Sequence, residues 1–525
     1  RNGDVVCPTH CLSSPSHNTI MWIHNSMITV AKLTASLATS AIVYKILRKA
    51  LLENKPVDCI RKDECRHGED DDEAAPLVIA YDCGTESLRV GLFRATDGVL
   101  LSMHASRYPT LNPRNGWAEQ RGSNWWKCLC ESTRRVITSM GRRFNRRRIK
   151  GVSIVATTCT LIPVGADGAT RNGNASSSVS SSTEGQNALA NAILWSDVRS
   201  AKQADWLHAA GGAAISRYSP LGVSAEWLLP KAMWMKEERP QIYEKTATFM
   251  EMHDYLVYRL TGRRVASANT AIQRGFFGAE EAETKGKGSV GWPSALFSLA
   301  NMEDLTAKLG EVYPVGAVVG AISPEVASEI GLSSKEEAQD GKHRAGDVKV
   351  VCGGGDAFVG ILGMAVADDG QIGLMTGSSN VVAGLQRNIS ERQRRMIQQN
   401  GVFGPFPDAV IPGFELLEAG QPSTGSMLSW FQRNFAPHSS FRELDLKAAE
   451  IPVGSGGLLV LDCFQGCRTP HIDSKARGVI IGLSLATRVE EVDCSVAHTC
   501  EHTHAHRLTL CKHISVSLSL SLSLS

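Results

Sequence analysis

Short apolar runs that end in turn residues recur along the chain and predict buried β-strands. The runs are Leu77 to Tyr81, Leu88 to Phe93, Val348 to Cys352, Ile372 to Met375 and Leu458 to Leu461. Apolar runs of about four to eight residues, bounded by Gly, Asp or Ser, are typical of strands that are covered on both faces. We therefore expect each run to lie inside a sheet.

Longer segments between these runs carry apolar residues at helical spacing. Trp227 to Tyr243 has Pro230 near its start, where proline is compatible with a helix, and Met250 to Leu260 is a second helix candidate. Strands that alternate with helices in this way predict an α/β protein.

Polar segments interrupt the pattern and predict surface loops or linkers. Residues 168–187 are rich in Ser, Gly, Asn and Thr, and 280–289 and 333–347 are similar in composition. The acidic residues 69–73 indicate a linker, so we expect order to begin at Leu77. Residues 1–75 form an N-terminal extension, and its mostly apolar part, 27–47, leaves open a weak membrane or targeting segment beside a poorly ordered one.

The last part of the chain has a different character. After Leu485 the apolar periodicity stops, His and Thr alternate between His498 and His506, and Ser and Leu alternate from Ser517 to Ser525. We interpret 486–525 as a low-complexity tail translated from a DNA repeat. The alternative is a metal-binding tract that uses Cys494, Cys500, His502, His504 and His506.

Composition narrows the class of protein. The chain has 525 residues, of which 43% are hydrophobic and 21% charged, and its net charge is +2. This is the composition of a globular protein with room for two or more domains, and it does not indicate a nucleic-acid partner. The 14 cysteines are too sparse for a disulfide scaffold, so we expect a reducing compartment, the cytoplasm.

Three Gly-rich turns carry the candidate chemistry. Asp82 to Ser87 offers a carboxylate for a metal ion together with amides and hydroxyls for phosphate oxygens, and Thr376 to Ser379 offers a second phosphate cradle. Asp356 follows three glycines, which let other groups approach closely. Phosphoryl transfer requires phosphate cradles, Mg²⁺ and a group that accepts the hydroxyl proton, and these turns supply candidates for each.

These turns belong to a longer series of segments that resembles the FGGY carbohydrate kinase family from about Pro76 to Leu485. The segments are DCGTESLRVGLF (Asp82 to Phe93), NGWAEQ (Asn115 to Gln120), ILWSDVRSAKQA (Ile193 to Ala204), SAEWLLPKAMWMKE (Ser224 to Glu237), GGGDAFVG (Gly353 to Gly360), MTGSSNVV (Met375 to Val382), EAGQPSTGSMLSWF (Glu418 to Phe431) and LDCFQGCRTPHIDSKARGVIIGL (Leu461 to Leu483). The AEWLLPK, EAGQ and GCRTP segments are most similar to the ribulokinase, or pentulose kinase, branch.

The resemblance implies two actin-like domains of the ribonuclease H type with the active site in the cleft between them. Sugar would bind in the first domain, expected at 76–346, and ATP mainly in the second, expected at 347–485. Closure of the cleft would exclude water. The resemblance also implies ATP and Mg²⁺ as cofactors and a small sugar as substrate. Formation of a homodimer and a membrane contact through 27–47 are left open.

Residue roles follow from matching positions in the resemblance. Asp356 would be the catalytic base for the sugar hydroxyl, and Asp82 would hold Mg²⁺. Contacts with the phosphates would come from Gly84, Thr85, Ser87, Arg89, Gly377 and Ser378. Contacts with the sugar would come from Lys231, Glu418 and Gln421.

Each role has a plainer alternative. Asp82 and Asp356 would then be turn-forming aspartates, and Lys231 and Glu418 an ordinary surface pair. Three tryptophans could form a stacking platform for sugar, but we expect them in the core: Trp195, Trp227 and Trp234.

The sequence departs from the family pattern in two places. Ala156 stands where the ribulokinase pattern Val-Asp-x-Thr-x-x-Thr has its aspartate, which weakens the assignment of the substrate. Nothing after Leu485 resembles the helices and the Gly-Gly motif that cradle adenosine in the family. We therefore expect a truncated second domain with one face uncovered.

The sequence favours an ATP-dependent kinase that phosphorylates a pentulose such as ribulose. The alternatives are a catalytically inactive, truncated paralogue that binds only sugar, and an ATPase of the actin or chaperone type with the same fold. The last would not need Asp356 after a glycine run.

Overall fold

The computed structural model describes residues 74–166, 188–278, 291–333 and 348–497, apart from 213–214, 216–218, 220, 453, 470–472 and 474. The three predicted surface loops and the N-terminal extension lie almost wholly outside this part, and so does the tail beyond residue 497. None of the described helices is long and apolar enough to cross a membrane. Residues 27–47 are not among those described.

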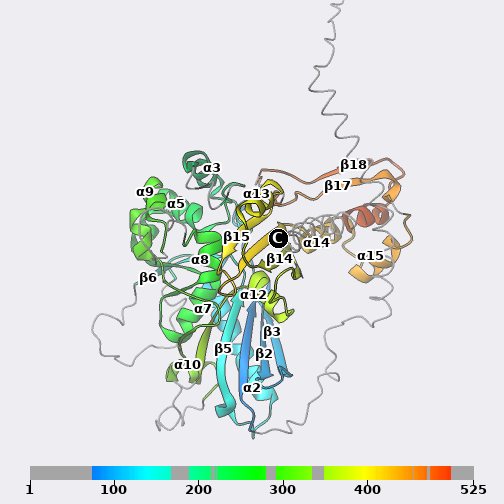
Figure 1. Cartoon of the computed structure of the whole chain (residues 1–525). Helices are drawn as coiled ribbons and strands as arrows, with labels where there is room; N and C mark the ends of the chain where they lie inside the picture. The colour runs from blue at the N-terminus through cyan, green and yellow to red at the C-terminus, as the bar shows by residue number, and fades with distance from the viewer. Residues whose placement is uncertain are drawn as a thin grey trace, which may run out of the picture. The chain divides into compact units, whose positions relative to one another are not determined.

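A six-stranded mixed sheet forms the core of the first domain (Figure 1). Its strands, in spatial order, are β11 (Val318–Ala321), β12 (Lys349–Gly355), β5 (Ile149–Ala156), β1 (Leu77–Cys83), β2 (Ser87–Arg94) and β3 (Leu100–Arg107). β1 pairs antiparallel with β2 and parallel with β5, and β12 runs parallel to β5. The predicted α/β class is therefore correct, and the predicted strands at 77–81, 88–93 and 348–352 are present.

One face of this sheet is buried under helices. In β1 the alternate residues Leu77, Ile79, Tyr81 and Cys83 are almost fully buried. Helix α2 (Gly122–Ser139) packs on β2 and β3, and α7 (Met252–Thr261) packs on β5 and β12. The Tyr81 hydroxyl reaches Thr133 on α2 at 3.1 Å. Every second residue of β1 is therefore apolar and buried, and this alternation determines which face of the strand packs against the helices.

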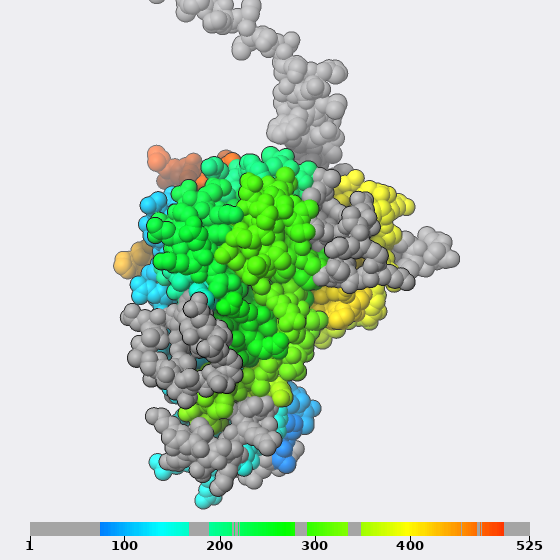
Figure 2. Space-filling model, turned by 90° about the vertical axis from the view of Figure 1, so that its left-hand side faces the viewer, coloured from blue at the N-terminus to red at the C-terminus, as the bar shows by residue number. Residues whose placement is uncertain are grey.

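The rest of the first domain surrounds a four-stranded sheet in the order β4 (Glu119–Gln120), β7 (Ala192–Ile193), β6 (Leu161–Gly165) and β8 (Thr246–Glu251). Figure 2 shows the face on which the green segments of this part of the chain predominate. Its helices are α3 (Ala201–Ala210), α5 (Leu228–Glu238), α6 (Pro240–Lys245), α8 (Ala268–Gly275), α9 (Ser294–Leu299) and α10 (Pro324–Glu329). Two short strands, β9 (Val265–Ser267) and β10 (Glu311–Tyr313), pair with each other. The short 3₁₀ helices are η1 (Arg146–Arg148) and η2 (Glu303–Lys308).

The second domain contains an antiparallel sheet in the order β13 (Ile372–Thr376), β14 (Asn380–Gln386), β16 (Glu415–Gln421) and β15 (Phe403–Pro407). Its helices are α12 (Asp356–Gly363), α13 (Glu391–Gln399), α14 (Gly425–Phe435) and α15 (Phe441–Ala448), with the 3₁₀ turn η4 (Ser455–Gly457). A separate ribbon consists of β17 (Leu459–Leu461) and β18 (Val479–Ile481). Within the described residues β13 is an edge strand of its sheet.

The structure places the boundary between the domains later than the sequence analysis did. β12 pairs with β5 and β11 in the first sheet, so residues 349–355 belong to the first domain and not to the second. The apolar run at 348–352 joins the parallel part of that sheet because its neighbour β5 offers a matching buried strand. Asp356 therefore lies at the end of a strand of the first domain.

Two expectations about the second domain need correction. Leu458 to Leu461 is not a buried strand, because Leu459 and Leu461 are 67% and 50% exposed. The residues after Leu485 are also more regular than expected, since 489–497 are helical and Val496 packs against Met427 of α14. The apolar spacing of Val489, Val492 and Val496 is that of a short helix and is hidden by the repetitive sequence that follows.

Candidate active site

The first predicted phosphate turn joins β1 and β2. The Gly84 amide donates to the Ser87 carbonyl oxygen at 3.0 Å, which closes the turn. Asp82 and Arg89 face each other across the two strands, and their charged groups approach to 2.6 Å. Their side chains remain 41% and 52% exposed. An ion pair that is this open to water is weak, so both groups can exchange their partner for a ligand.

Asp356 is positioned by the close packing of the glycines before it. A Cβ on Gly353 would lie 1.8 Å from the carbonyl oxygen of Ile154, and one on Gly355 would lie 2.2 Å from the Thr158 methyl group. Only glycine allows β12 to approach β5 and the following loop this closely. Asp356 then begins α12 and accepts a hydrogen bond from the Ala357 amide at 2.8 Å.

The surroundings of Asp356 favour its protonated form. Burial raises its pKa to about 6, and the negative charge of Asp82 adds to the rise. The hydrogen bond from the Ala357 amide and the positive charge of Arg89 act in the opposite direction. The structure thus brings together three of the predicted residues, Asp82, Arg89 and Asp356. A carboxyl group with a pKa near neutrality in such a place is suited to proton transfer.

The second predicted phosphate turn, Thr376 to Ser379, lies against the start of α14. The Thr424 amide donates to the Ser378 carbonyl at 3.0 Å, and the Gly425 amide donates to the Gly377 carbonyl at 3.1 Å. A Cβ on Gly425 would lie 2.5 Å from that Gly377 carbonyl oxygen. The positive end of the α14 dipole is therefore beside the turn, which favours a negatively charged group there.

Thr424, Gly425 and Ser426 were not among the predicted site residues. The signal that could have found them is a repeated tripeptide, because Thr424-Gly425-Ser426 has the same sequence as Thr376-Gly377-Ser378. The first tripeptide begins with the last residue of β13, and the second lies three residues after the end of β16 in the same sheet.

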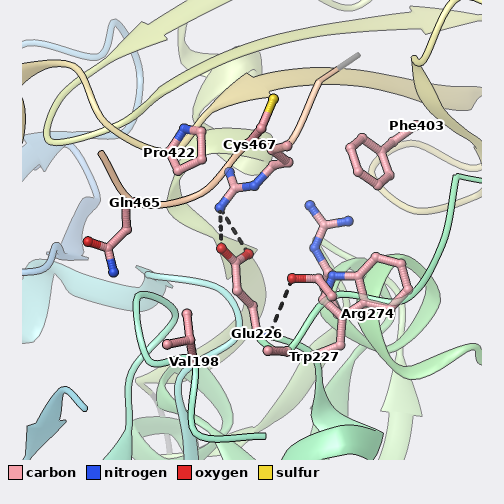
Figure 3. Close-up of a pocket in the computed structure, with 11 residues that line it drawn as sticks. Val198, Glu226, Trp227, Arg274, Phe403, Pro422, Gln465 and Cys467 are labelled. Atoms are coloured by element: carbon pink, nitrogen blue, oxygen red, sulfur yellow. Dashed lines mark hydrogen bonds and ion pairs between the residues drawn. The ribbon is translucent and has the colours of Figure 1, made fainter. Parts of the chain in front are cut away.

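A pocket with an empty volume of about 490 Å³, open solvent included, lies between segments of the two domains (Figure 3). From the first domain it is lined by Val198, Ser224, Ala225, Glu226, Trp227 and Arg274, and from the second by Phe403, Pro422, Gln465, Cys467 and Arg468. Arg468 donates to both carboxylate oxygens of Glu226 at 2.9 Å. Arg274 donates to both oxygens of Glu418, at 2.5 and 2.6 Å. Two ion pairs therefore join the domains at this pocket.

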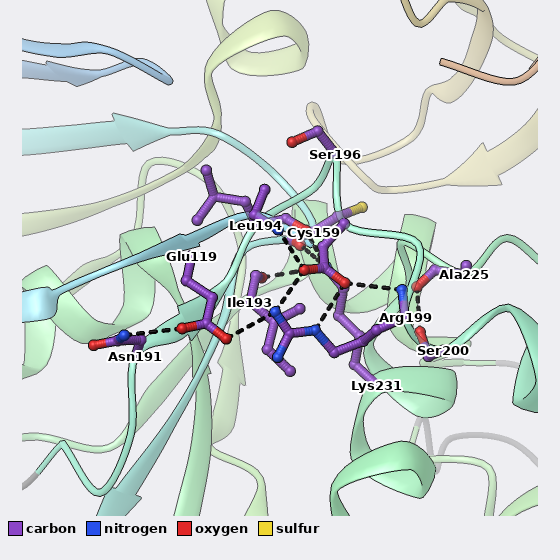
Figure 4. Close-up of polar contacts among 12 residues, drawn as sticks. Glu119, Cys159, Asn191, Ile193, Leu194, Ser196, Arg199, Ser200, Ala225 and Lys231 are labelled. Carbon is purple, nitrogen blue, oxygen red and sulfur yellow. Dashed lines mark hydrogen bonds and ion pairs between the residues drawn. The ribbon is translucent and has the colours of Figure 1, made fainter. Parts of the chain in front are cut away.

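The predicted sugar contacts lie in different surroundings. Lys231 is fully buried, and its ammonium group donates to the carbonyl oxygens of Cys159, Ile193 and Leu194 (Figure 4). Burial lowers its pKa. Glu418 is also fully buried, but its partner is Arg274. The alternative that Lys231 and Glu418 form a surface pair is therefore wrong.

Gln421, the third predicted sugar contact, follows Glu418 on β16. Its amide nitrogen donates to the Asp462 carboxylate, while its buried oxygen has no hydrogen-bond partner among the described residues. Glu418 and Gln421 thus reach the region of the pocket, whereas the three donors of Lys231 are directed at carbonyl groups.

The tryptophans divide between the core and the site. Trp227 and Trp234 are 3% and 7% exposed, as expected for core residues. Trp195 is less buried, and its indole N–H donates to the Thr85 hydroxyl at 3.0 Å. The guanidinium of Arg468 lies 6.0 Å from the Trp195 ring centroid. Trp195 therefore links the first phosphate turn to the pocket.

Two further matching segments of the sequence serve to hold the first domain together. Arg199 forms ion pairs with Glu119 at 2.8 Å and with Asp197 at 2.7 Å (Figure 4). Its guanidinium also lies 3.7 Å from the Trp117 ring centroid. Asp197 in turn accepts a hydrogen bond from the Ala118 amide. This network fixes the loop that presents Trp195.

Ala156, where the family pattern has an aspartate, ends β5 between β1 and β12. It is 1% exposed and is aligned with Cys83 on one side and Gly355 on the other. An aspartate here would be a further buried carboxyl group beside the strand ends that carry Asp82 and Asp356. Its absence leaves the pKa of Asp356 free of that additional negative charge.

The carboxylate oxygens of the site suit an Mg²⁺ ion that is bound together with the phosphates of a nucleotide. Within the described part of the chain, no cluster of three or more His, Cys, Asp or Glu side chains could form a metal cage. Asp82 and Asp356 nevertheless offer carboxylate oxygens, the ligand type that Mg²⁺ prefers, and Mg²⁺ commonly binds through one or two carboxylates together with phosphates and water. The partial exposure of Asp82 leaves room for such ligands.

Comparison with known proteins identifies the family. Residues 77–363 match the N-terminal domain, and residues 375–501 the C-terminal domain, of the FGGY family of carbohydrate kinases. The chain is 26% identical over 452 residues to a ribulokinase of Halalkalibacterium halodurans, which covers 79% of this chain and 72% of that protein. It is also 26% identical over 409 residues to a xylulose kinase of Bacillus subtilis, covering 77% of this chain and 71% of that protein.

Solved structures show the same fold. The xylulose kinase from Rhodospirillum rubrum superimposes with a TM-score of 0.62 at 22% identity, over 83% of this chain and 79% of that one. The first family match extends through β12 and Asp356, in agreement with the sheet topology, and the second continues beyond Leu485 through the helical residues 489–497. The two matches together span both sheets and the pocket between them, and the chain belongs to the FGGY family of carbohydrate kinases.

Proposed function

We propose that the chain catalyses the ATP-dependent phosphorylation of a pentulose, with ribulose as the first candidate. Membership of the family makes it a carbohydrate kinase, a phosphotransferase with a sugar hydroxyl as acceptor. The observation that carries the proposal is the position of Asp356 at the end of a first-domain strand, beside the Asp82–Arg89 pair. Ribulokinases and xylulose kinases match the chain at the same identity, which supports a five-carbon ketose.

Asp356 is the general base in this proposal. With a pKa of about 6 it is ionised at neutral pH, yet it is basic enough to accept the proton of a sugar hydroxyl as the new O–P bond forms. The hydroxyl is a terminal one, because a primary alcohol reaches most easily into a narrow site. The glycines before Asp356 hold it against β5, so little reorganisation precedes the transfer.

The two turns hold the phosphates of ATP. Gly84, Thr85, Ser87 and Arg89 contact the transferred phosphoryl group, and Gly377 and Ser378 contact the phosphates from the second domain. Arg89 supplies positive charge where negative charge develops, once it leaves Asp82. Asp82 would then hold Mg²⁺, whose positive charge would neutralise phosphate charge. Thr424 and Gly425 keep the second turn in place.

Lys231, Glu418 and Gln421 shape the sugar site. Glu418 orients Arg274, and Gln421 presents an oxygen that has no partner among the described residues. Lys231 holds the backbone at Cys159 and Leu194, two segments that flank the site. We propose that its effect on the sugar passes through that backbone.

A second candidate function is sugar binding without phosphorylation. It is favoured by the apolar side chains of the β17–β18 ribbon, where Leu459 and Ile481 are 67% and 59% exposed. An uncovered apolar face in the second domain would accompany an incomplete nucleotide site. The two candidates differ in one measurable property, the release of ADP.

The test is sugar-dependent release of ADP by the purified chain with ribulose and Mg·ATP. Asp356→Asn removes the base with little change of shape and is expected to lower kcat by about 10²- to 10⁴-fold. Asp368→Asn changes an exposed aspartate of the second domain and is expected to leave kcat unchanged. Turnover that survives in Asp356→Asn would refute the base assignment. Ribulose binding without ADP release by the unmodified chain would establish the second candidate.

A further inference from the structure

Each positive group that lines the pocket between the domains is paired with a negative one. Arg468 is paired with Glu226 and Arg274 with Glu418, and the side chains of these four residues are at most 15% exposed. In the two pairs each arginine NH2 group reaches both oxygens of its carboxylate. Both positive charges are thus compensated within the protein.

The four groups act as one cluster and not as two separate pairs. Burial lowers the pKa of Arg468, but the carboxylate of Glu226, followed by that of Glu418, more than reverses the effect. The pKa of Arg274 is likewise raised, against its burial, by Glu418 and to a smaller degree by Glu226. Each guanidinium therefore interacts with both carboxylates.

The pocket also has the chemistry of a carbohydrate site. Trp227, Phe403 and Pro422 provide apolar surface (Figure 3). Among the described residues, the Nε and NH1 groups of Arg468 have no acceptor, since its hydrogen bonds to Glu226 use NH2 alone. A guanidinium has five N–H donors, so Arg468 can donate to ligand hydroxyls while it remains paired.

The pocket adjoins the proposed transfer site on two sides. The Arg468 guanidinium lies beside Trp195, whose indole donates to Thr85 of the first phosphate turn. The Arg274 guanidinium lies 5.4 Å from the ring centroid of Phe358, two residues after Asp356 on α12. A ligand in the pocket would thus have one end directed to the residues of phosphoryl transfer.

We propose that this pocket is the subsite for the part of the substrate remote from the phosphorylated carbon, and that Glu226, by neutralising Arg468, makes it select uncharged sugars over sugar acids of the same length. This inference rests on the proposed sugar kinase function. A carboxylate in the pocket would meet Glu226. It would find no uncompensated positive charge, because Glu226 neutralises Arg468 and Glu418 neutralises Arg274. A sugar hydroxyl can instead donate to a carboxylate or accept from a guanidinium.

The charge of Glu226 is therefore the determinant to remove. In Glu226→Gln the Arg468 charge is left uncompensated in a largely buried site, where it attracts an anion strongly. We expect the variant to gain affinity for a sugar acid and to lose its preference for the ketose. Glu238→Gln, an exposed change at the last residue of helix α5, which begins two residues after Glu226, is the control and is expected to change neither affinity.

The experiment is titration calorimetry of the full chain with D-ribulose and with D-ribonate, without nucleotide, at neutral pH. The unmodified chain is expected to bind ribulose at least about tenfold more tightly than ribonate, and Glu226→Gln to reverse this order. The double variant Glu226→Gln/Arg468→Gln restores neutrality and is expected to restore the preference for ribulose, at lower affinity. This variant distinguishes an effect of the net charge on the preference from an effect of general disruption of the pocket.

The outcomes distinguish this inference from the proposed function. If ribulose is phosphorylated but Glu226→Gln leaves the ratio of the two affinities unchanged, the subsite is wrong and the kinase function stands. A preference of the unmodified chain for ribonate overturns the selectivity inference. If neither probe binds and ribulose yields no ADP release, both the subsite and the proposed ribulose kinase function are overturned.

Discussion

The raised pKa of Asp356 results from its position directly after the end of β12. The three glycines before it pack the strand against β5, and the carboxyl group then lies where burial and the charge of Asp82 both disfavour ionisation. The hydrogen bond from the Ala357 amide and the positive charge of Arg89 limit this rise in the pKa of Asp356. The result is a carboxyl group that is ionised near neutrality and protonated in mild acid.

This environment predicts the pH dependence of catalysis. Asp356 can accept a proton only when it is ionised, and its pKa is about 6. We therefore expect kcat/KM for the sugar to be level above about pH 7 and to fall about tenfold for each pH unit well below the pKa. The measurement is a pH profile of ADP release at low sugar concentration.

Far-UV circular dichroism over the same range serves as the control, because it separates loss of the base from loss of the fold. A profile that stays flat down to about pH 4.5, near the ordinary pKa of a carboxyl group, would contradict the role of Asp356 as a buried base.

Single residues show what the sequence can and cannot reveal about a site. Asp82 and Asp356 could be proposed from the sequence because each lies at the end of an apolar run in a Gly-containing turn. The structure brings them together because β1 and β12 both run parallel to β5, so that their carboxyl ends meet at one edge of the sheet. The burial of Lys231 by three carbonyl groups depends on how α5 packs over β6 and β7, which local sequence does not encode. Arg274 was missed because a single charge on a helix carries no motif. Glu226 lies in the AEWLLPK segment but was missed because its partner, Arg468, is 242 positions away along the chain.

At the scale of the elements, two turns of the same sequence contact each other in the second domain. Thr376-Gly377-Ser378 begins with the last residue of β13. Thr424-Gly425-Ser426 lies at the start of α14 and donates three amide hydrogen bonds to the first tripeptide. The contact of Gly425 with the Gly377 carbonyl leaves no space for a side chain. The position of the second phosphate turn is therefore set by a glycine in a different element.

Gly425→Ala tests this dependence. Its new methyl group would lie 2.5 Å from the Gly377 carbonyl oxygen, so the turn or the helix must move. If the turn binds phosphate as proposed, a displacement approaching 1 Å is expected to lower kcat/KM for ATP by about 10- to 100-fold. Steady-state kinetics with varied ATP at saturating sugar measure the effect.

Gly291→Ala is the control for this change, because a Cβ at Gly291 meets nothing within 4 Å. Unchanged ATP kinetics in Gly425→Ala would show that the turn at Gly377 takes no part in binding the nucleotide.

The elements of the fold were predictable where a single pattern determined them. The strands at 77–81, 88–93, 348–352 and 372–375 follow from apolar runs that end in glycine turns. The same rule failed at Leu458 to Leu461, because β17 pairs only with β18 and no layer of the described chain covers it. An apolar run indicates a strand, but the burial of that strand depends on what other segments supply.

At the scale of the whole molecule, buried charges connect the two domains. Arg274 on α8 and Glu418 on β16 pair in a site where their side chains are 5% and 0% exposed. Removal of one partner leaves the other as an unpaired buried charge, which is far costlier than replacement of both by apolar groups. The pair therefore makes the stability of each domain depend on the other.

We expect Glu418→Gln to lower the free energy of unfolding by about 3–5 kcal/mol. The double variant Arg274→Met/Glu418→Leu is expected to recover most of the loss, since it leaves neither member of this pair as an unpaired buried charge. Urea denaturation followed by fluorescence measures both. A double variant as unstable as Glu418→Gln would show that packing, and not the charge, is what the pair provides.

The residues that form the pocket are also distant along the chain. Arg274 and Glu418 are 144 positions apart, and Glu226 and Arg468 are 242 positions apart. Contacts of such long range form late, because most of the polypeptide must already be ordered before the ends of these loops can meet. We therefore expect the proposed sugar subsite to be among the last features that a newly made chain acquires. A sugar that binds there binds only the folded chain and therefore stabilises it against unfolding. Such a sugar would act as a chemical chaperone.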